Sequence, residues 1–127
     1  MRFYQFLKFS IVGSLGFCVD LFSFYLYSSV FPYPLPRILS FISAVIFTYI
    51  CNRTLTFKKS MRKFWKEFPS YFLSMLGGGT LNLLVFFFLN NYSTYFHSRA
   101  YLSIAVGSIA GLGMNYLLSL IVFQYKR

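Results

Sequence analysis

The chain has 127 residues, of which 57% are hydrophobic and 11% are charged, and its net charge is +10. Soluble domains carry about 25% charged residues, so this composition excludes an ordinary soluble domain. In a soluble protein the positive charge would suggest nucleic-acid binding, but here the basic residues lie between apolar segments. We therefore expect them to contact membrane lipid and no nucleic acid.

Four apolar segments fill most of the chain. A helix needs about 20 apolar residues to cross a bilayer core of about 30 Å, and three segments reach that length. The second is shorter, and we expect Arg37 and Arg53 at its ends to extend toward the two membrane interfaces. The prediction is an all-α membrane protein with four transmembrane helices in one domain, residues 1–127. The helices are predicted at about residues 8–30, 36–56, 68–90 and 99–124.

The first segment contains an acidic residue, Asp20, on the same helix face as Gly13 and Gly16. A carboxylate at bilayer depth is costly and by default has a function. Small residues let helix backbones approach closely in lipid, so we expect Asp20 to point into the helix bundle or a cavity. The alternative is a structural pair with a neighbouring asparagine or hydroxyl group.

The third and fourth segments repeat this arrangement with amides in place of the acid. Asn82 shares a face with Gly78, and Asn115 follows Gly107 and Gly111 at four-residue spacing. We expect both amides to point into the bundle or a cavity, while helix packing alone would account for the glycines.

Basic residues are unevenly distributed and predict the orientation of the chain. Most lie near the two termini or in the central connection: Arg2, Lys8, Arg53, Lys58, Lys59, Arg62, Lys63, Lys66, Lys126 and Arg127. The other two connections contain only Arg37 and Arg99. Because basic residues mark cytoplasmic loops, we predict that both termini are cytoplasmic. We interpret Glu67 as part of a surface ion pair or as a charge at a helix N-terminus.

The sequence contains a duplication. Gly16 and Asp20 are followed 62 residues later by Gly78 and Asn82, and Arg37 is followed by Arg99 at the same distance. Each half has two helices, an even number, so both halves have one orientation. The prediction is two parallel two-helix repeats, related by an axis along the membrane normal.

Three parts of the sequence carry a resemblance to a known family. Phe6–Gly13, followed by Val19-Asp20, resembles the opening of the GtrA-like family. Asn52–Phe57, which ends the second helix before a basic loop, resembles the second signature of that family. Asn115 with the closing Val122-Phe123 resembles its ending, so the similarity covers nearly the whole chain.

The resemblance implies a function in bacterial envelope glycan assembly. Members of the family are thought to flip a polyprenyl-phosphate-linked monosaccharide across the cytoplasmic membrane, for modification of a cell-surface polysaccharide. A polyprenyl-phosphate glycosyltransferase is the implied partner. The candidate substrate-binding residues are cations for the phosphate, Lys8 and Arg53 inside and Arg37 and Arg99 outside, and hydrogen-bonding residues for the sugar, Asp20, Asn82 and Asn115. Topology and interfacial anchoring are the alternative roles for the cations.

No pattern in the sequence is typical of a catalytic site. Asp20 and Glu67 are the only acids and His97 is the only histidine, so paired carboxylates and metal clusters have no residues to form them. We expect neither an enzyme nor a bound cofactor or metal.

Two other functions remain open. Small proton-coupled multidrug transporters also use four short helices with one acid in the first, and would exchange protons for a cationic drug at Asp20. The basic residues that flank the spans suit an anionic head group better. The second alternative is a non-transporting subunit that anchors or regulates a glycosyltransferase.

Four helices can scarcely enclose a sugar and a phosphate together, so we expect a homo-oligomer with its axis along the membrane normal. The stripe of Ser103, Gly107 and Gly111 is suited to close helix contact. Some small-residue stripes are expected to meet inside one chain and at least one to join two chains.

Overall fold

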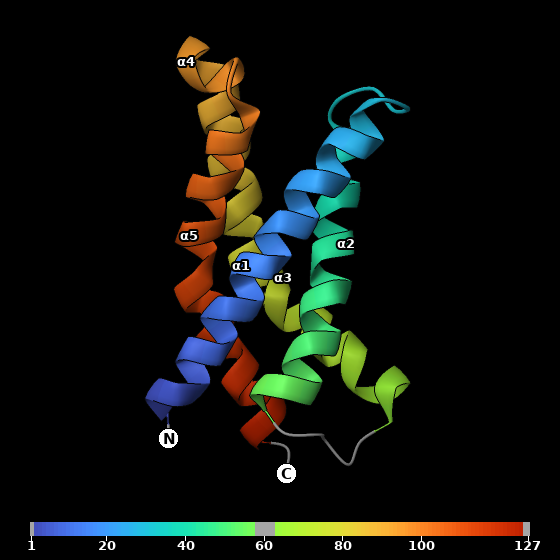
Figure 1. Cartoon of the computed structure of the whole chain (residues 1–127), viewed down its shortest axis with the longest axis vertical. Coiled ribbons are helices and arrows are strands. Elements are labelled where there is room, and N and C mark those ends of the chain that lie inside the picture. Colours follow the sequence, from blue (N-terminus) through green and yellow to red (C-terminus); the bar gives the residue numbers. More distant parts are fainter. Residues whose placement is uncertain (1, 58–62, 126–127) are drawn as a thin grey trace. The chain divides into compact units, whose positions relative to one another are not determined.

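The structure is a computed structural model that describes residues 2–57 and 63–125. Its helices are α1 (Arg2–Ser28), α2 (Leu35–Cys51), α3 (Phe64–Tyr92), α4 (Thr94–His97) and α5 (Ala100–Leu120), with two π-helical segments, η1 (Asn52–Thr56) and η2 (Ile121–Tyr125) (Figure 1). These described residues contain no strand.

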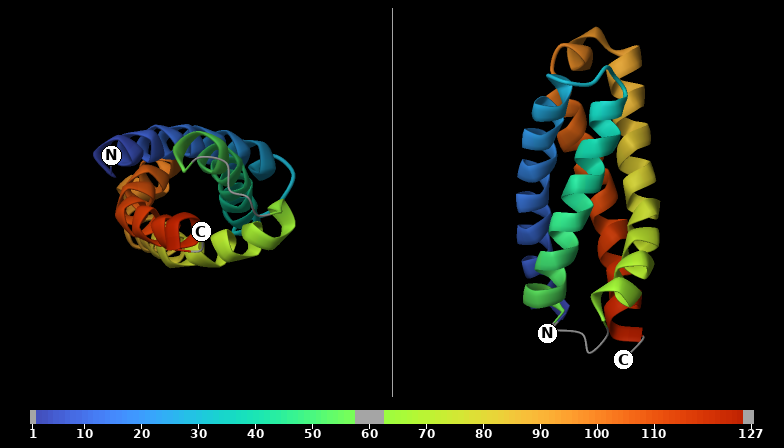
Figure 2. Two further views of the ribbon diagram at one scale, coloured as in Figure 1. Left: turned by 90° about the horizontal axis from the view of Figure 1, so that it is seen from below. Right: turned by 90° about the vertical axis from the view of Figure 1, so that its right-hand side faces the viewer.

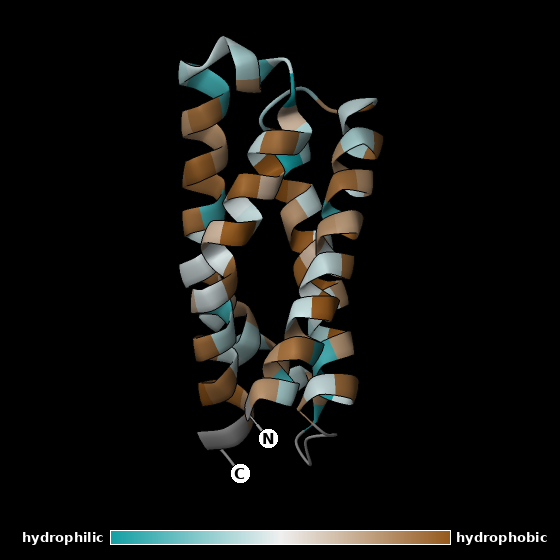
Figure 3. Cartoon of the chain, turned by 60° about the vertical axis from the view of Figure 1, so that its left-hand side comes forward, coloured by the Kyte–Doolittle hydropathy of each residue, from teal (hydrophilic) through white to brown (hydrophobic). Residues whose placement is uncertain are grey.

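The prediction of an all-α protein with four membrane-spanning helices is confirmed. Four helical stretches are long and apolar enough to cross a bilayer: Phe3–Ser28, Leu35–Thr56, Phe64–Tyr92 and Ala100–Phe123. Figure 3 shows hydrophobic residues along all four, interrupted by isolated hydrophilic positions.

The predicted helix ends were less accurate. α1 already begins at Arg2, and α3 begins at Phe64, four residues before the predicted start at residue 68. Pro69 is the sixth residue of α3, where it has no backbone N–H to donate to the Trp65 carbonyl oxygen. The predicted second outer loop contains α4, whose N-terminus is capped by the Ser93 side chain. Five basic residues of the orientation argument, Lys58, Lys59, Arg62, Lys126 and Arg127, lie outside the described residues.

The chain forms two compact units that meet in sequence between Phe68 and Pro69. In the first unit, α1 and α2 run antiparallel side by side (Figures 1 and 2). They approach closely at Gly16, where an added Cβ atom would collide with the side chain of Thr48. Near the start of α1, the rings of Phe9 and Phe57 meet edge to face with centroids 6.3 Å apart.

In the second unit, α3 and α5 run side by side through a stripe of glycines. A Cβ atom on Gly111 would lie 2.7 Å from the Gly78 carbonyl oxygen, and one on Gly107 would lie 2.6 Å from that of Asn82. The stripe of Ser103, Gly107 and Gly111 was expected to serve close helix contact, and Gly107 and Gly111 make that contact inside one chain. The homo-oligomer stays a prediction.

The two units share their construction. Four buried residues of α1 have buried equivalents in α3 at the 62-residue spacing: Phe9 and Tyr71, Gly16 and Gly78, Asp20 and Asn82, Phe24 and Phe86. The ring pair of Phe9 and Phe57 has its counterpart in Tyr71 and Phe123, whose centroids are 5.6 Å apart. The second helix of each unit ends in a π-helical segment, which no sequence pattern had suggested. Each unit is thus one two-helix repeat.

Candidate functional site

Asp20 and Arg37 form a buried ion pair inside the first unit. Arg37 Nη1 donates a hydrogen bond to Asp20 Oδ1 at 2.8 Å and another to Ser40 Oγ at 3.2 Å. The Arg37 and Asp20 side chains are 0% and 4% exposed. Ser40 in turn donates to the Arg37 carbonyl oxygen at 3.0 Å. The charges of Asp20 and Arg37 therefore neutralise each other inside the first unit.

This pair corrects the expected position of Arg37, whose side chain we had directed toward a membrane interface. The guanidinium instead turns back to α1, because a buried carboxylate is stabilised strongly by a cation at hydrogen-bond distance. The alternative that we had considered for Asp20 named an asparagine or hydroxyl as the partner. The Ser40 hydroxyl does bond to Asp20, but the ion-pair partner is an arginine. A hairpin closed at Pro32–Pro36 brings Asp20 and Arg37 together, and this was the signal available in the sequence.

Glu67 is buried at the other end of the first unit. Its Oε1 atom accepts hydrogen bonds from Arg53 Nε at 3.1 Å and from the Tyr49 hydroxyl at 3.2 Å, and the residue is 1% exposed. It lies in the first turn of α3 and in an ion pair, as predicted, but the pair is not at the surface. The rings of Phe64 and Phe68 pack on Tyr49 with centroids 5.1 and 5.0 Å away, which accounts for the burial.

Lys8 lies at the same end of this unit as Arg53. Its Nζ donates to the Leu55 carbonyl oxygen at 3.3 Å and is 4.7 Å from the centre of the Tyr4 ring. Leu55 and Arg53 both belong to η1. The two cations predicted for the inner side are thus brought to one end of the hairpin.

Arg99 is bound differently from its repeat equivalent Arg37. Its Nη1 donates to the Tyr95 carbonyl oxygen and to Ser98 Oγ, both at 3.2 Å, and its guanidinium carbon lies 4.2 Å from the Tyr95 ring centre. Both acids of the chain form ion pairs with other arginines. Among the described residues, no carboxylate therefore balances Arg99.

The two amides both lie in the second unit. Asn82 on α3 is 9% exposed and contacts Gly107 on α5. Asn115 on α5 lies against Gly78, and its Oδ1 atom is buried with no hydrogen-bond partner within the described part of the chain. The structure therefore groups six of the seven candidate residues in three places: Asp20 with Arg37, Lys8 at the same end of the hairpin as Arg53, and the two amides along one helix pair. The seventh, Arg99, lies at the start of α5 and belongs to none of these groups.

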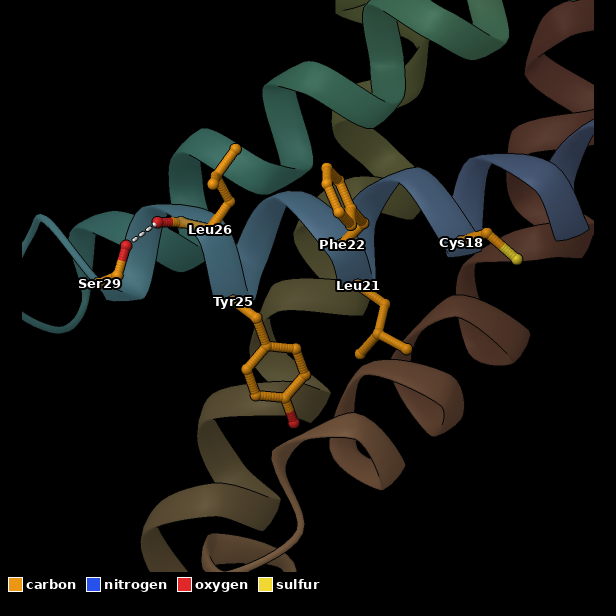
Figure 4. Close-up of a pocket in the computed structure, with 6 residues that line it drawn as sticks. All are labelled: Cys18, Leu21, Phe22, Tyr25, Leu26 and Ser29. Atoms are coloured by element: carbon orange, nitrogen blue, oxygen red, sulfur yellow. Dashed lines mark hydrogen bonds between the residues drawn. The ribbon is translucent and has the colours of Figure 1, made fainter.

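A shallow apolar hollow of about 590 Å³ lies on α1. Cys18, Leu21, Phe22, Tyr25, Leu26 and Ser29 line it (Figure 4). Its hydroxyl group at Ser29 is bonded to the Leu26 carbonyl oxygen at 2.7 Å. No charged side chain is among these residues, so the hollow suits hydrocarbon rather than a head group. No sequence pattern had indicated it.

The four spans, and the charges and amides buried within them, define a small multi-pass membrane protein. The family profile described as "GtrA/DPMS, transmembrane domain" matches residues 8–124, almost the whole chain. The chain belongs to this family, as its GtrA-like signatures had indicated. It matches no curated protein and no solved structure.

Proposed function

We propose that this protein flips a polyprenyl-phosphate-linked monosaccharide across the bacterial cytoplasmic membrane, for modification of a cell-surface polysaccharide. Membership of the GtrA/DPMS transmembrane family supports a flippase-type role in general. One observation of the structure carries the choice of an anionic substrate. The two acidic residues of the chain, Asp20 and Glu67, both form ion pairs with arginines. Within the described residues, no carboxylate therefore remains to balance Lys8 and Arg99.

The phosphate of the lipid is the anion that these cations would receive. In this proposal both termini are cytoplasmic, and the phosphate enters at Lys8 and Arg53 and leaves at Arg99. A planar guanidinium can hold two phosphate oxygens at once. Arg37 contributes only when the phosphate displaces Asp20, and the exchange of one monoanion for another keeps Arg37 neutralised. The sugar hydroxyls then meet Asn82 and Asn115 in the second unit, and no covalent bond is made or broken.

The same ion pair argues against a proton-coupled multidrug transporter. Such a transporter needs an acid that exchanges protons for a cationic drug, but Asp20 is held by Arg37 at 2.8 Å with both side chains buried. A cationic drug that approached Asp20 would have to displace Arg37, which is also positively charged and is already bound there.

Ligand binding to the purified protein tests the choice between these two functions. Undecaprenyl-phosphate glucose and its galactose and N-acetylglucosamine analogues should raise the melting temperature in detergent, since a ligand of the folded state stabilises it. The lipophilic cation tetraphenylphosphonium should not. Stabilisation by the cation alone, lost in Asp20→Asn, would instead favour the drug transporter.

A further inference from the structure

Three buried side-chain oxygens on α5 have no hydrogen-bond partner in the described part of the chain. They belong to Ser103, Asn115 and Ser119, which share one helix face with Gly107 and Gly111 at four-residue spacing. Ser103 and Ser119 are both 0% exposed. A fourth such oxygen, Asn90 Oδ1, lies on α3 in the same unit.

The equivalent face in the first unit is fully bonded. Ser40, Asn52 and Thr56 on α2 and η1 precede Ser103, Asn115 and Ser119 by 63 residues. Ser40 Oγ bonds to the Arg37 carbonyl oxygen at 3.0 Å, and Thr56 Oγ1 donates to Asn52 Oδ1 at 2.8 Å. In that unit, the described residue with an unpartnered buried hydroxyl is Ser10, which lies on α1 and not on this face. The polar side chains at equivalent positions of the two hairpins therefore differ. They are hydrogen-bonded in the first hairpin and have no partner among the described residues in the second.

Local backbone bonds do not replace the missing partners. Helical serines elsewhere in this chain donate to the carbonyl oxygen four residues earlier, as Ser14 does to Ser10 at 2.9 Å and Ser74 does to Ser70 at 2.8 Å. Ser103 and Ser119 make no such bond. Water is scarce at the depth of a bilayer core, so a polar group that persists there without a partner is costly.

We propose that the second repeat binds the sugar of the lipid substrate at Asn115 and Ser119, which lie one turn apart on α5, and that the first repeat is its internally neutralised counterpart. This inference rests on the proposed flippase function and assigns the sugar to one repeat. Hydroxyl groups of a monosaccharide both donate and accept hydrogen bonds, which matches the Ser119 hydroxyl and the Asn115 amide oxygen. Ser103 is about 24 Å from Ser119 along the helix, too far to contact the same sugar. The Asn115 and Ser119 oxygens are covered in this structure, so the sugar reaches them only when α3 and α5 separate.

Serine-to-alanine variants test the assignment with little change of volume. We would measure binding of the full-length protein to undecaprenyl-phosphate glucose, or to whichever of its galactose and N-acetylglucosamine analogues binds best, and to undecaprenyl phosphate without sugar. Ser119→Ala should weaken binding of the sugar lipid about 3- to 10-fold and leave binding of the bare phosphate lipid unchanged. Ser103→Ala removes an equally buried hydroxyl about 24 Å away along the helix and should change neither affinity. Ser14→Ala, which removes an exposed hydroxyl bonded to its own helix, is the matched control and should alter neither affinity.

Equal weakening for both lipids, or full sugar-lipid affinity in Ser119→Ala, would overturn the assignment of the sugar to α5. Melting temperatures at or above that of the unaltered protein should accompany the specific loss, because alanine removes an unsatisfied buried hydroxyl. A protein with native residues that bound none of the sugar lipids would refute the proposed function itself, so the two failures are distinguishable.

Discussion

At the scale of single residues, Asp20 and Arg37 neutralise each other as a buried pair in the first unit. Each partner alone would be an uncompensated charge at bilayer depth, whereas together they also satisfy Ser40. A pair of this kind need not stabilise the fold more than an apolar pair of similar volume would. Its retention in a chain with only two acids is therefore consistent with a role in binding an anion.

The first prediction is strong energetic coupling between the two partners. Asp20→Asn and Arg37→Gln should each lower the free energy of unfolding by about 3–5 kcal/mol, because each leaves a buried charge unpaired. The double variant should lose less than the sum, with a coupling of about 1–3 kcal/mol. Unfolding in detergent micelles measures all four proteins, and additive losses would show that the pair does not form.

The second prediction concerns Asp20 in cells. If phosphate must displace Asp20 from Arg37, Asp20→Asn should reduce glycan modification even where protein abundance is normal, because the exchange no longer preserves neutrality. Quantifying the modified polysaccharide against protein level measures this effect. Normal modification by this variant would remove Asp20 from the mechanism.

The third prediction concerns Arg53. Arg53→Gln should weaken binding of a polyprenyl-phosphate sugar about tenfold, and binding of the uncharged polyprenol much less, because a charge-assisted contact to the phosphate is lost. Arg53→Lys should restore part of the affinity, since an ammonium group replaces the charge but not the planar fork. If both ligands lost affinity equally, the bond between Arg53 and Glu67 would be structural only.

At the scale of helices, glycine positions separate close contacts from open surface. Gly111 meets the Gly78 backbone, whereas a Cβ atom on Gly113 would have nothing within 4 Å. Both lie on α5, only two residues apart, so they form a matched pair.

The fourth prediction follows from this difference. Gly111→Ala should lower the melting temperature, because its Cβ atom would lie 2.7 Å from a backbone carbonyl oxygen. Gly113→Ala should be neutral or stabilise the helix by up to about 1 kcal/mol, as alanine does at open helix positions. Thermal unfolding of the two variants tests this ordering, and the reverse order would mean that α3 and α5 do not pack through this face.

Sequence reasoning succeeded for the helices because the bilayer requires long apolar runs, and such runs are visible without a structure. It failed at the first turn of α3, where Lys66 and Glu67 separate Phe64 and Trp65 from the following apolar run. It placed Glu67 in a surface ion pair and gave Asp20 no arginine partner, because the burial of a pair depends on helix rotation as well as on the hairpin connection. The unsatisfied hydroxyls of Ser103 and Ser119 were equally invisible, because a serine in a helix normally bonds to its own backbone.

At the scale of the whole molecule, the balance of charge supports the proposal of an anionic substrate over a cationic one. Two acids face twelve basic residues, and both acids are already neutralised inside the first unit. The basic residues therefore depend on anions from outside the chain, either lipid head groups or the phosphate of a substrate. The orientation of the chain decides on which side of the membrane each cation would meet that phosphate.

The fifth prediction is the orientation. In a background with Cys18 and Cys51 replaced by alanine, single cysteines at Tyr33 and Ser98 should react with a membrane-impermeant maleimide in intact cells. A cysteine at Lys63 should react only after the membrane is opened, because the basic loop is expected to be cytoplasmic. Labelling of Lys63→Cys from outside would reverse the direction assigned to every cation.

Translocation by the purified protein tests the central claim most directly. Undecaprenyl-phosphate glucose would be placed in both leaflets of vesicles that contain only this protein, and external periodate, which oxidises accessible vicinal diols, would be added. We predict that oxidation proceeds beyond the outer leaflet to nearly all of the lipid, whereas in protein-free vesicles it stops at about half, the share of one leaflet. Oxidation that stops at the outer leaflet with the protein present, and passes it only when a glycosyltransferase is added, would contradict a flippase and identify a non-transporting subunit.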